Sequence, residues 1–225
     1  MLTPEAKEVL LTADVIIGYS TYIKLIEPYL AGKTVLSSGM KKETDRARKA
    51  VEAALDGKHA AVISSGDPGV YGMAGPILEI APAGLDVVVI PGVTAATASA
   101  AVLGAPLMHD FAVVSLSDLL TPWETILRRL EAAASADYVI VLYNPRSRGR
   151  EGHLDTARNI ILEHRDAATP VGIVKNCCRK GEQFKITTLR ELDVQDVDMV
   201  TTVVIGNSQT KVINGRMVTP RGYLL

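Results

Sequence analysis

The sequence predicts an α/β protein built from two domains. Short apolar runs such as DVIIGY (residues 14–19) and YVIVLY (138–143) alternate with longer amphipathic segments along the chain. Runs that are apolar at every position, rather than at every second one, are typical of parallel strands covered by helices on both faces. The 225 residues suffice for two small domains, each with its own core.

The first half of the chain is expected to alternate regularly between the two kinds of element. Thr3-Pro4 has the chemistry of a helix start, because threonine caps a helix and proline suits its first turn. The segments that follow are predicted in order as helix 5–13, strand 14–19, helix 20–30, strand 33–36, helix 43–55, strand 60–64, helix 73–80, strand 87–90 and the small-residue helix 94–104.

The pattern changes after Gly104. The stretch APLMHDF has a proline and no clear period, so we expect a linker near 105–110 between a domain spanning 1–104 and a second spanning 111–225. In the second half, strands follow one another more often, which favours a mixed sheet after a mostly parallel first one. The expected elements are strands 111–115, 138–143, 171–175, 184–188 and 201–206, with helices near 122–134 and 153–164.

The overall composition excludes several classes of function. A net charge of -1 disfavours a general nucleic-acid binder, and the chain has no apolar run long enough for a membrane span. The two cysteines, Cys177 and Cys178, are adjacent, which is no disulfide framework and suits a reducing cytoplasm. No Cys/His spacing typical of zinc occurs, so no metal is expected.

Four polar, glycine-containing loops follow the carboxyl ends of predicted strands. In open α/β sheets, ligands bind outside these strand ends, so the loops predict a site in the cleft between the domains. Each loop taken alone is equally compatible with an ordinary strand-to-helix turn. The four are SGDPGVYG (65–72), PGVTAAT (91–97), YNPRSRGR (143–150) and NCCRKGEQ (176–183).

The charges in these loops indicate what kind of ligand they suit. SGDPGVYG lacks the lysine of a phosphate-binding loop and has Asp67 instead, which suits ribose hydroxyls or a cationic ligand, or else caps the next helix. Basic side chains in the later loops suit carboxylates: Arg146, Arg148, Arg150 and Lys175. His109, in the linker, is a candidate for substrate contact or proton transfer. The cysteines are interpreted as packing residues rather than nucleophiles.

Read in order, these loops make the chain resemble the tetrapyrrole (precorrin) methyltransferases of cobalamin biosynthesis, which use S-adenosylmethionine. Within that family the chain is most similar to the branch that methylates C17 of the macrocycle and contracts the ring. The resemblance covers essentially the whole chain. It rests on ISSGDPGVYGMAG (63–75), IPGVTAATASAAVLGAPLMHDF (90–111), SLSDLLTPW (115–123), LYNPRSRGREGHL (142–154), VVIGNSQT (203–210) and MVTPRGY (217–223).

The resemblance implies the tetrapyrrole methylase fold, a cytoplasmic homodimer, and cofactor and macrocycle in the interdomain cleft. The cofactor it implies is S-adenosylmethionine, which becomes S-adenosylhomocysteine after methyl transfer. The residues that the resemblance places along this cofactor are Ser65, Gly66, Asp67, Val70, Thr94, Ala95, Tyr143, Asn144 and Cys177. The macrocycle carries many carboxylate arms, which accounts for Arg146, Arg148, Arg150 and Lys175, and we expect Arg146 to bind one arm. Asp67 and His109 are the candidates for proton transfer during contraction.

Three alternatives stay open at this point. A nucleotide- or sugar-phosphate enzyme is disfavoured by the missing lysine and by the acid in the glycine loop. A shortened, non-catalytic protein that binds the macrocycle or cofactor, and another precorrin C-methyltransferase, fit the same residues. The sequence does not decide whether the macrocycle enters with cobalt or metal-free, although SLSDLLTPW and NPRSRGREGHL favour the cobalt form by resemblance.

Family members normally begin with an apolar strand and a Gly-x-Gly-Pro-Gly loop just before a segment like MLTPEAKEVLLTADVIIGY, and this sequence starts at Met1. We expect weakened or absent activity for the 225-residue chain, because backbone groups beside that strand would lack partners. Cofactor affinity measured with and without an added strand and loop tests this expectation. Equal affinities would contradict it.

Overall fold

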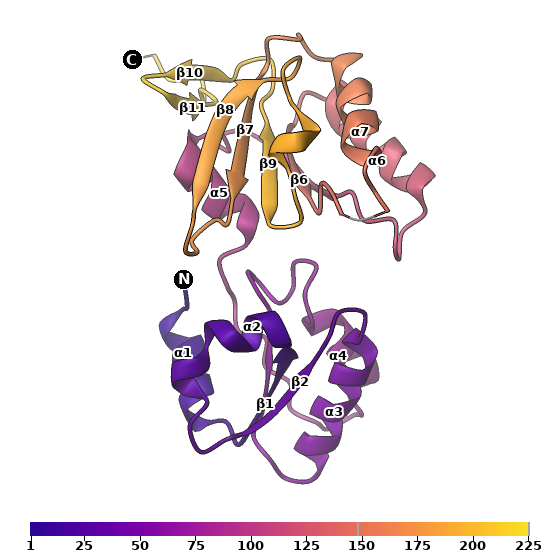
Figure 1. The fold of residues 1–225 in the computed structure, drawn as a ribbon, viewed down its shortest axis with the longest axis vertical. Coiled ribbons are helices and arrows are strands. Elements are labelled where there is room, and N and C mark those ends of the chain that lie inside the picture. The colour runs from indigo at the N-terminus through magenta and orange to yellow at the C-terminus, as the bar shows by residue number, and fades with distance from the viewer. Residues whose placement is uncertain (148, 225) are drawn as a thin grey trace. The chain divides into compact units, whose positions relative to one another are not determined.

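The computed structural model describes residues 1–147 and 149–224, and Figure 1 shows its ribbon. The chain divides into two compact units, Met1–Thr94 and Ala95–Leu225. This division precedes the predicted linker at 105–110, because α5 (Ala95–Leu103) packs against strands of the second unit. The expected α/β class is confirmed.

The first unit contains a three-stranded parallel sheet in the order β2-β1-β3. Its first helix begins as the sequence predicts, since the Thr3 side chain accepts a hydrogen bond from the Ala6 amide. The elements are α1 (Pro4–Thr12), β1 (Val15–Tyr19), α2 (Ser20–Leu25), η1 (Glu27–Tyr29), β2 (Thr34–Ser38), α3 (Glu43–Leu55), β3 (Ala60–Ile63) and α4 (Ala74–Ile80).

Successive residues of β1 pack against helices on opposite faces of this sheet. Ile16 belongs to a buried cluster that includes Leu10 of α1 and Ile23 of α2. Val15 and Ile17, which point the other way, pack with Ala50 of α3. The run VIIGY is therefore apolar at consecutive positions because both of its faces are covered.

The predicted strand at 87–90 is wrong. Residues 86–94 form no strand, and Val88 and Val89 are 67% and 42% exposed. Valine-rich segments fit a pleated surface well, but a strand also needs a neighbour that supplies backbone hydrogen bonds. Within the described residues, β3 pairs with β1 and the valine segment pairs with no strand.

The second unit contains a five-stranded mixed sheet in the order β5-β6-β9-β7-β8, as the succession of strands predicted. Strands β5 and β6 are parallel, and the other neighbours are antiparallel. The elements after α5 are β4 (Gly104–Ala105), β5 (Phe111–Ser115), α6 (Trp123–Ser135), β6 (Val139–Tyr143), α7 (His153–Leu162), β7 (Pro170–Lys175), β8 (Gln183–Thr188), η2 (Val194–Asp196), β9 (Thr201–Ile205), β10 (Lys211–Ile213) and β11 (Arg216–Val218).

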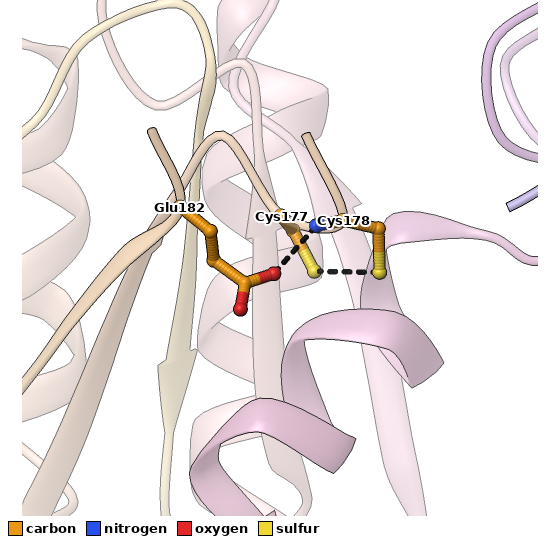
Figure 2. Close-up of side chains that lie close together, drawn as sticks. All are labelled: Cys177, Cys178 and Glu182. Atoms are coloured by element: carbon orange, nitrogen blue, oxygen red, sulfur yellow. Dashed lines mark hydrogen bonds between the residues drawn. The ribbon is translucent and has the colours of Figure 1, made fainter. Parts of the chain in front are cut away.

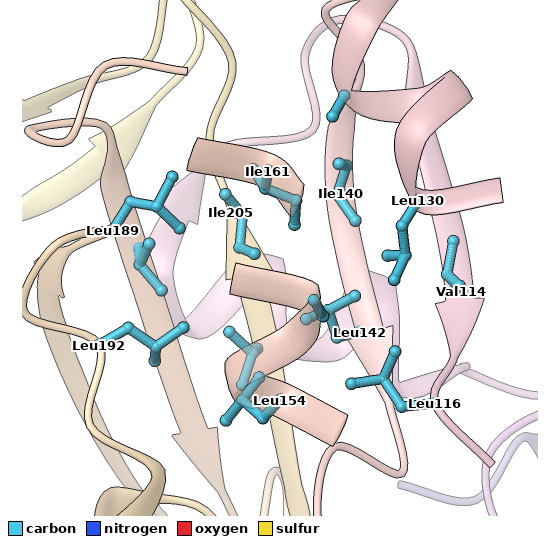
Figure 3. Close-up of a cluster of buried hydrophobic side chains, with 14 of the residues drawn as sticks. Val114, Leu116, Leu130, Ile140, Leu142, Leu154, Ile161, Leu189, Leu192 and Ile205 are labelled. Carbon is cyan, nitrogen blue, oxygen red and sulfur yellow. The ribbon is translucent and has the colours of Figure 1, made fainter. Parts of the chain in front are cut away.

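Helices cover both faces of this sheet. On one face Ile140 and Leu142 of β6 pack with Leu130 of α6 and Leu154 of α7, as Figure 3 shows. On the other face the intervening β6 residues, Val139 and Val141, pack with Ala96 and Leu103 of α5. The alternation along β6 therefore explains why YVIVLY is apolar throughout.

Gly172 of β7 allows α5 to lie close to the sheet. A Cβ atom added at Gly172 would lie 2.3 Å from Cδ1 of Leu103, which is fully buried. A side chain at this position would push α5 away from β7 and β9. The absence of a side chain thus fixes where the carboxyl-terminal end of α5 lies.

The tail of the chain forms strands that the sequence did not predict. Strands β10 and β11 form a hairpin, and β11 pairs in parallel with the two-residue β4 in a separate small sheet. The buried hydroxyls of Thr210 and Thr219 lie 2.7 Å apart and join the segments GNSQT and TPRGY.

In the described part of the chain, no helix has both the length and the hydropathy that a membrane span requires.

The Gly172 contact gives a stability prediction. Gly172→Ala should lower the free energy of unfolding by roughly 1–3 kcal/mol in a urea titration, because its Cβ overlaps a packed core. Gly152→Ala is the control, since an added Cβ there meets nothing within 4 Å. Equal unfolding midpoints for both variants and the parent chain would contradict this packing.

Candidate functional site

The carboxylate of Asp67 joins two loops of the first unit. Its Oδ1 accepts a hydrogen bond from the Gly69 amide at 2.8 Å, and its Oδ2 accepts one from the Gly92 amide at 2.9 Å. The first bond tightens the loop after β3, and the second ties this loop to the PGV turn 25 residues later. Hydrogen bonds to an ionised acceptor are stronger than neutral ones, so this carboxylate is an effective anchor.

Asp67 does not cap the following helix, so that alternative is wrong. The residue just before α4 is Met73, and its amide donates to the Ser64 hydroxyl at 3.0 Å. The Ala74 amide donates to the carbonyl of Pro68. Ser64 and Pro68 thus satisfy the start of α4, and Asp67 is left to hold the two loops together.

The two loops touch so closely that Gly92 has no room for a side chain. A Cβ atom added there would lie 2.1 Å from the carbonyl oxygen of Gly66. Gly66 itself has a φ of 77°, a left-handed conformation that favours glycine. The predicted cofactor residues Ser65, Gly66 and Val70 therefore lie on a fixed loop, and Thr94 follows closely after the PGV turn.

In the second unit, Tyr143 meets the start of α5. The Ala96 amide donates to the Tyr143 hydroxyl oxygen at 2.6 Å, so the last residue of β6 satisfies an otherwise unpaired amide in the first turn of the helix. Asn144, with a φ of 50°, donates from Nδ2 to the Ser115 hydroxyl at the end of β5. The predicted residues Ala95, Tyr143 and Asn144 thus lie around the adjacent ends of β5, β6 and α5.

Cys177 packs against the same cluster of side chains as Tyr143. Burial raises the pKa of the Cys177 thiol to about 11, although the Ser99 hydroxyl acts in the opposite direction. A thiol with this pKa is protonated at neutral pH and is a poor nucleophile. Cys178 is exposed, and Figure 2 shows its sulfur beside that of Cys177, with Glu182 close by.

The predicted anchors for carboxylates differ in what they already bind. Arg146 donates from Nη1 to the Val194 carbonyl at 2.7 Å, which fixes it to η2. Lys175 forms an ion pair with Asp198; burial raises the pKa of that carboxyl, but hydrogen bonds from Lys175, Thr201 and Val200 outweigh burial and lower it. Arg148 lies outside the described residues.

Arg150 is different, because part of its guanidinium group is unsatisfied. Its Nε donates to the Ser147 hydroxyl at 2.7 Å. Its Nη1 is buried and has no hydrogen-bond partner among the described residues. An unpaired buried charged donor is costly to the fold, and the Nε atoms of Arg158 and Arg165 are unsatisfied in the same way.

The two candidates for proton transfer lie in different units. Asp67 belongs to the first unit and His109 to the second. His109 is exposed, and its Nδ1 lies 4.0 Å from the carboxylate of Asp110. Their roles in proton transfer stay predictions.

Sequence reasoning missed a side-chain cluster built from two of the most distinctive segments. The ring of His153, the first residue of α7, stacks on Trp123 with centroids 4.0 Å apart. Its Nδ1 lies 3.2 Å from the Leu116 carbonyl, and its Nε2 lies 3.7 Å from Asp118. All of these residues belong to the segments SLSDLLTPW and GREGH, which the sequence analysis singled out. Their contact with one another is visible only in the structure.

A small hollow in the first unit was also not predicted. It has a volume of about 240 Å³ and lies beside the carboxyl end of β2. Its lining includes Ser38, Lys42, Arg46 and Lys49, and none of the predicted cofactor residues lines it. The Arg46 guanidinium is already bound to Ser38, Gly39 and Glu43.

These features define an α/β protein in which three of the four polar loops, those after β3, β6 and β7, follow the carboxyl ends of strands, where ligands bind in open α/β sheets. Residues 1–193 match the family model described as tetrapyrrole (corrin/porphyrin) methylases, and the chain belongs to that family.

Individual relatives agree with this assignment. The chain is 51% identical, over all of its length and 95% of the relative's, to a probable cobalt-factor III C(17)-methyltransferase of Salmonella typhimurium. It is 43% identical to a protein of the same name from Methanocaldococcus jannaschii, covering 99% of this chain and 92% of that one. A crystal structure of the methyltransferase CobJ superposes with a TM-score of 0.92 at 36% identity, covering 97% of this chain and 93% of the other.

The contact between the two loops of the first unit can be tested directly. Gly92→Ala should lower the free energy of unfolding by roughly 1–3 kcal/mol and speed amide hydrogen exchange at 65–72, since its Cβ cannot approach Gly66. Gly75→Ala, where an added Cβ meets nothing within 4 Å, should leave loop exchange unchanged. Unaltered exchange in the Gly92 variant would show that the loops are not held in this way.

Proposed function

We propose that this protein transfers a methyl group from S-adenosylmethionine to C17 of a precorrin-3B-type macrocycle, or of its cobalt form, and contracts the ring. The observation that carries the proposal is the 51% identity to a probable cobalt-factor III C(17)-methyltransferase over the whole chain. The 43% identity to a second protein of that name supports the same assignment. The reaction is a step of cobalamin biosynthesis.

The loops of the first unit suit a cofactor that has no phosphate. S-Adenosylmethionine carries an ammonium, a sulfonium and ribose hydroxyls, and its sulfonium supplies an activated methyl group. A carboxylate offers about four acceptor positions, and the amides of Gly69 and Gly92 use two at Asp67. The remaining positions can accept hydrogen bonds from a hydroxyl or an ammonium. Ser65, Gly66, Val70, Thr94, Ala95, Tyr143, Asn144 and Cys177 complete the proposed cofactor set.

The protein's main contribution to methyl transfer is alignment. The methyl group is already activated, so the chain has to hold the nucleophilic carbon in line with it and keep water away. Positioning of two reactants supplies roughly 7–11 kcal/mol in favourable cases. The internal hydrogen bonds of Asp67 and Tyr143 suit this task, because loops that are fixed in advance need little reorganisation when ligands bind.

Arg150 is the proposed first anchor for a carboxylate arm of the macrocycle. Its unpaired buried Nη1 supports this role, whereas Arg146 and Lys175 are engaged with Val194 and Asp198. In this proposal Arg146 and Lys175 hold the loops that carry Val194 and Asp198 in place. Arg148 remains a further candidate for binding a carboxylate arm. Asp67 and His109 are proposed for proton movement at the ring during contraction.

A homodimer in the cytoplasm is proposed as the working state. Free, adjacent cysteines support a reducing compartment.

Binding and turnover together test the proposed function. Calorimetry should show binding of S-adenosylhomocysteine and none of ATP; the reverse would favour a nucleotide-phosphate enzyme. Labelled S-adenosylmethionine and the tetrapyrrole should then yield labelled macrocycle. Binding without turnover would point to a non-catalytic binding protein instead.

The two arginines give a sharper, paired prediction. Arg150→Gln should raise KM for the macrocycle by about 10–100-fold, since hydrogen bonds to charged groups contribute roughly 1.5–3 kcal/mol. The dissociation constant for S-adenosylhomocysteine should stay unchanged. Steady-state kinetics and calorimetry measure the two quantities.

Arg146→Gln is the matched variant. It should lower the free energy of unfolding by roughly 1.5–3 kcal/mol through loss of the bond to the Val194 carbonyl, and change KM little. A large KM effect for Arg146→Gln combined with none for Arg150→Gln would reverse the assignment.

A further inference from the structure

Cys177, Cys178 and Glu182 lie together in the loop after β7. Of these three residues, only Cys177 belongs to the proposed cofactor set. Each of Cys177, Cys178 and Glu182 offers one ligand atom, and these atoms all lie within 4.8 Å of one another. Figure 2 shows the two sulfurs side by side, with the carboxylate turned toward them. Both cysteines are free thiols.

The separation of the two sulfurs matches a shared metal ion. The sulfurs are 3.8 Å apart. Two Zn–S bonds of about 2.3 Å at a tetrahedral angle place their sulfurs about 3.8 Å from each other. Side chains of neighbouring residues in an extended chain point to opposite sides. Here Cys178 has a φ of 58°, a left-handed conformation, and its sulfur lies on the same side as that of Cys177.

Glu182 is fixed beside the sulfurs. Its Oε2 accepts a hydrogen bond from the Cys178 amide at 2.6 Å, which holds the carboxylate against the loop. This oxygen is the one that lies nearer the two sulfurs in Figure 2, and a carboxylate oxygen that accepts one hydrogen bond keeps a second lone pair for a metal ion. Two sulfurs and one oxygen leave one position open in a tetrahedral site.

A buried hydroxyl supports the site from behind. Ser99 of α5 is fully buried, and within the described residues its Oγ forms no hydrogen bond of acceptable geometry. This hydroxyl is close enough to the Cys177 thiol to lower the pKa of that thiol, against the larger effect of burial. Metal ligands are usually held by an outer hydrogen-bond donor or acceptor, and an unsatisfied buried hydroxyl next to a ligand sulfur is suited to donate to it.

We propose that Cys177, Cys178 and Glu182 form a binding site for one thiophilic divalent cation of the Zn²⁺ class, with Ser99 as the outer donor to Cys177. A second group of possible ligands, Glu131, Glu163 and His164, lies at the surface and contains no sulfur. Soft thiolate ligands select Zn²⁺ and related ions over Mg²⁺ and Ca²⁺. The second group therefore serves as a control.

Cobalt(II) is the probe for this site, with the full chain and neither cofactor nor macrocycle present. Sulfur-to-cobalt charge-transfer absorption should appear with one Co²⁺ per chain, together with the visible bands of tetrahedral Co²⁺, and one equivalent of Zn²⁺ should remove both. The charge-transfer band reports sulfur ligands directly, so surface binding through carboxylates does not produce it.

Variants separate the ligands from the fold. Cys177→Ser and Cys178→Ser should each weaken Co²⁺ binding by at least about tenfold and reduce the charge-transfer band. Glu182→Gln keeps an oxygen that can accept a hydrogen bond from the Cys178 amide, so this variant should fold normally. It should bind Co²⁺ more weakly than the parent chain, because it lacks the carboxylate charge. His164→Asn, in the second group, should leave the band and the affinity unchanged.

Several results would overturn the proposal. These are absence of the charge-transfer band in the parent chain, an unchanged band in Cys178→Ser, or one metal ion for every two chains, which would indicate ligands shared between chains. Cys178 is exposed, and circular dichroism of its variant confirms the fold. Because the measurement needs no cofactor or substrate, its failure leaves the proposed methyl transfer untouched.

Discussion

The carboxylate of Asp67, bound to the amides of Gly69 and Gly92, is the contact on which the arrangement of the two glycine-containing loops of the first unit depends. It joins two segments that are distant in the sequence, and the missing side chain of Gly92 lets their backbones approach. An acid in a glycine-rich loop first suggests a ligand. In this fold the acid organises the loop, and only its remaining acceptor positions are available for a cofactor.

The second unit uses side chains in the same way. The Tyr143 hydroxyl accepts from the first turn of α5, Asn144 bonds to Ser115, and Lys175 pairs with Asp198. Each of these residues ends or follows a strand, and each satisfies a polar group of the fold. These contacts hold the loops at the strand ends in place. Arg150 differs from them, because its buried Nη1 has no hydrogen-bond partner among the described residues.

The sequence predicts the helices and strands that have a strong local pattern. It does not predict structure that depends on contacts with residues far along the chain. The strands at 139–143 and 111–115 and the helix from Trp123 were expected within a residue or so, because consecutive apolar residues and the amphipathic period are local signals. The valine run at 87–90 has the same local signal but no neighbouring strand among the described residues. Neither the role of Gly172 nor the bond from Arg146 to Val194 has a local signal, since each partner lies far along the chain. The paired thiols beside Glu182 were visible as residues, but their 3.8 Å separation was not.

The position of the transferred methyl group tests the central claim most directly. S-Adenosylmethionine carrying a ¹³C-labelled methyl group, incubated with this chain and either precorrin-3B or cobalt-factor III, should give a ring-contracted product. Nuclear magnetic resonance should then find one label per macrocycle, at C17. A label at another ring carbon would identify a different tetrapyrrole methylase, and no label in the macrocycle, with cofactor bound, would contradict the account of this protein as a C17-methyltransferase.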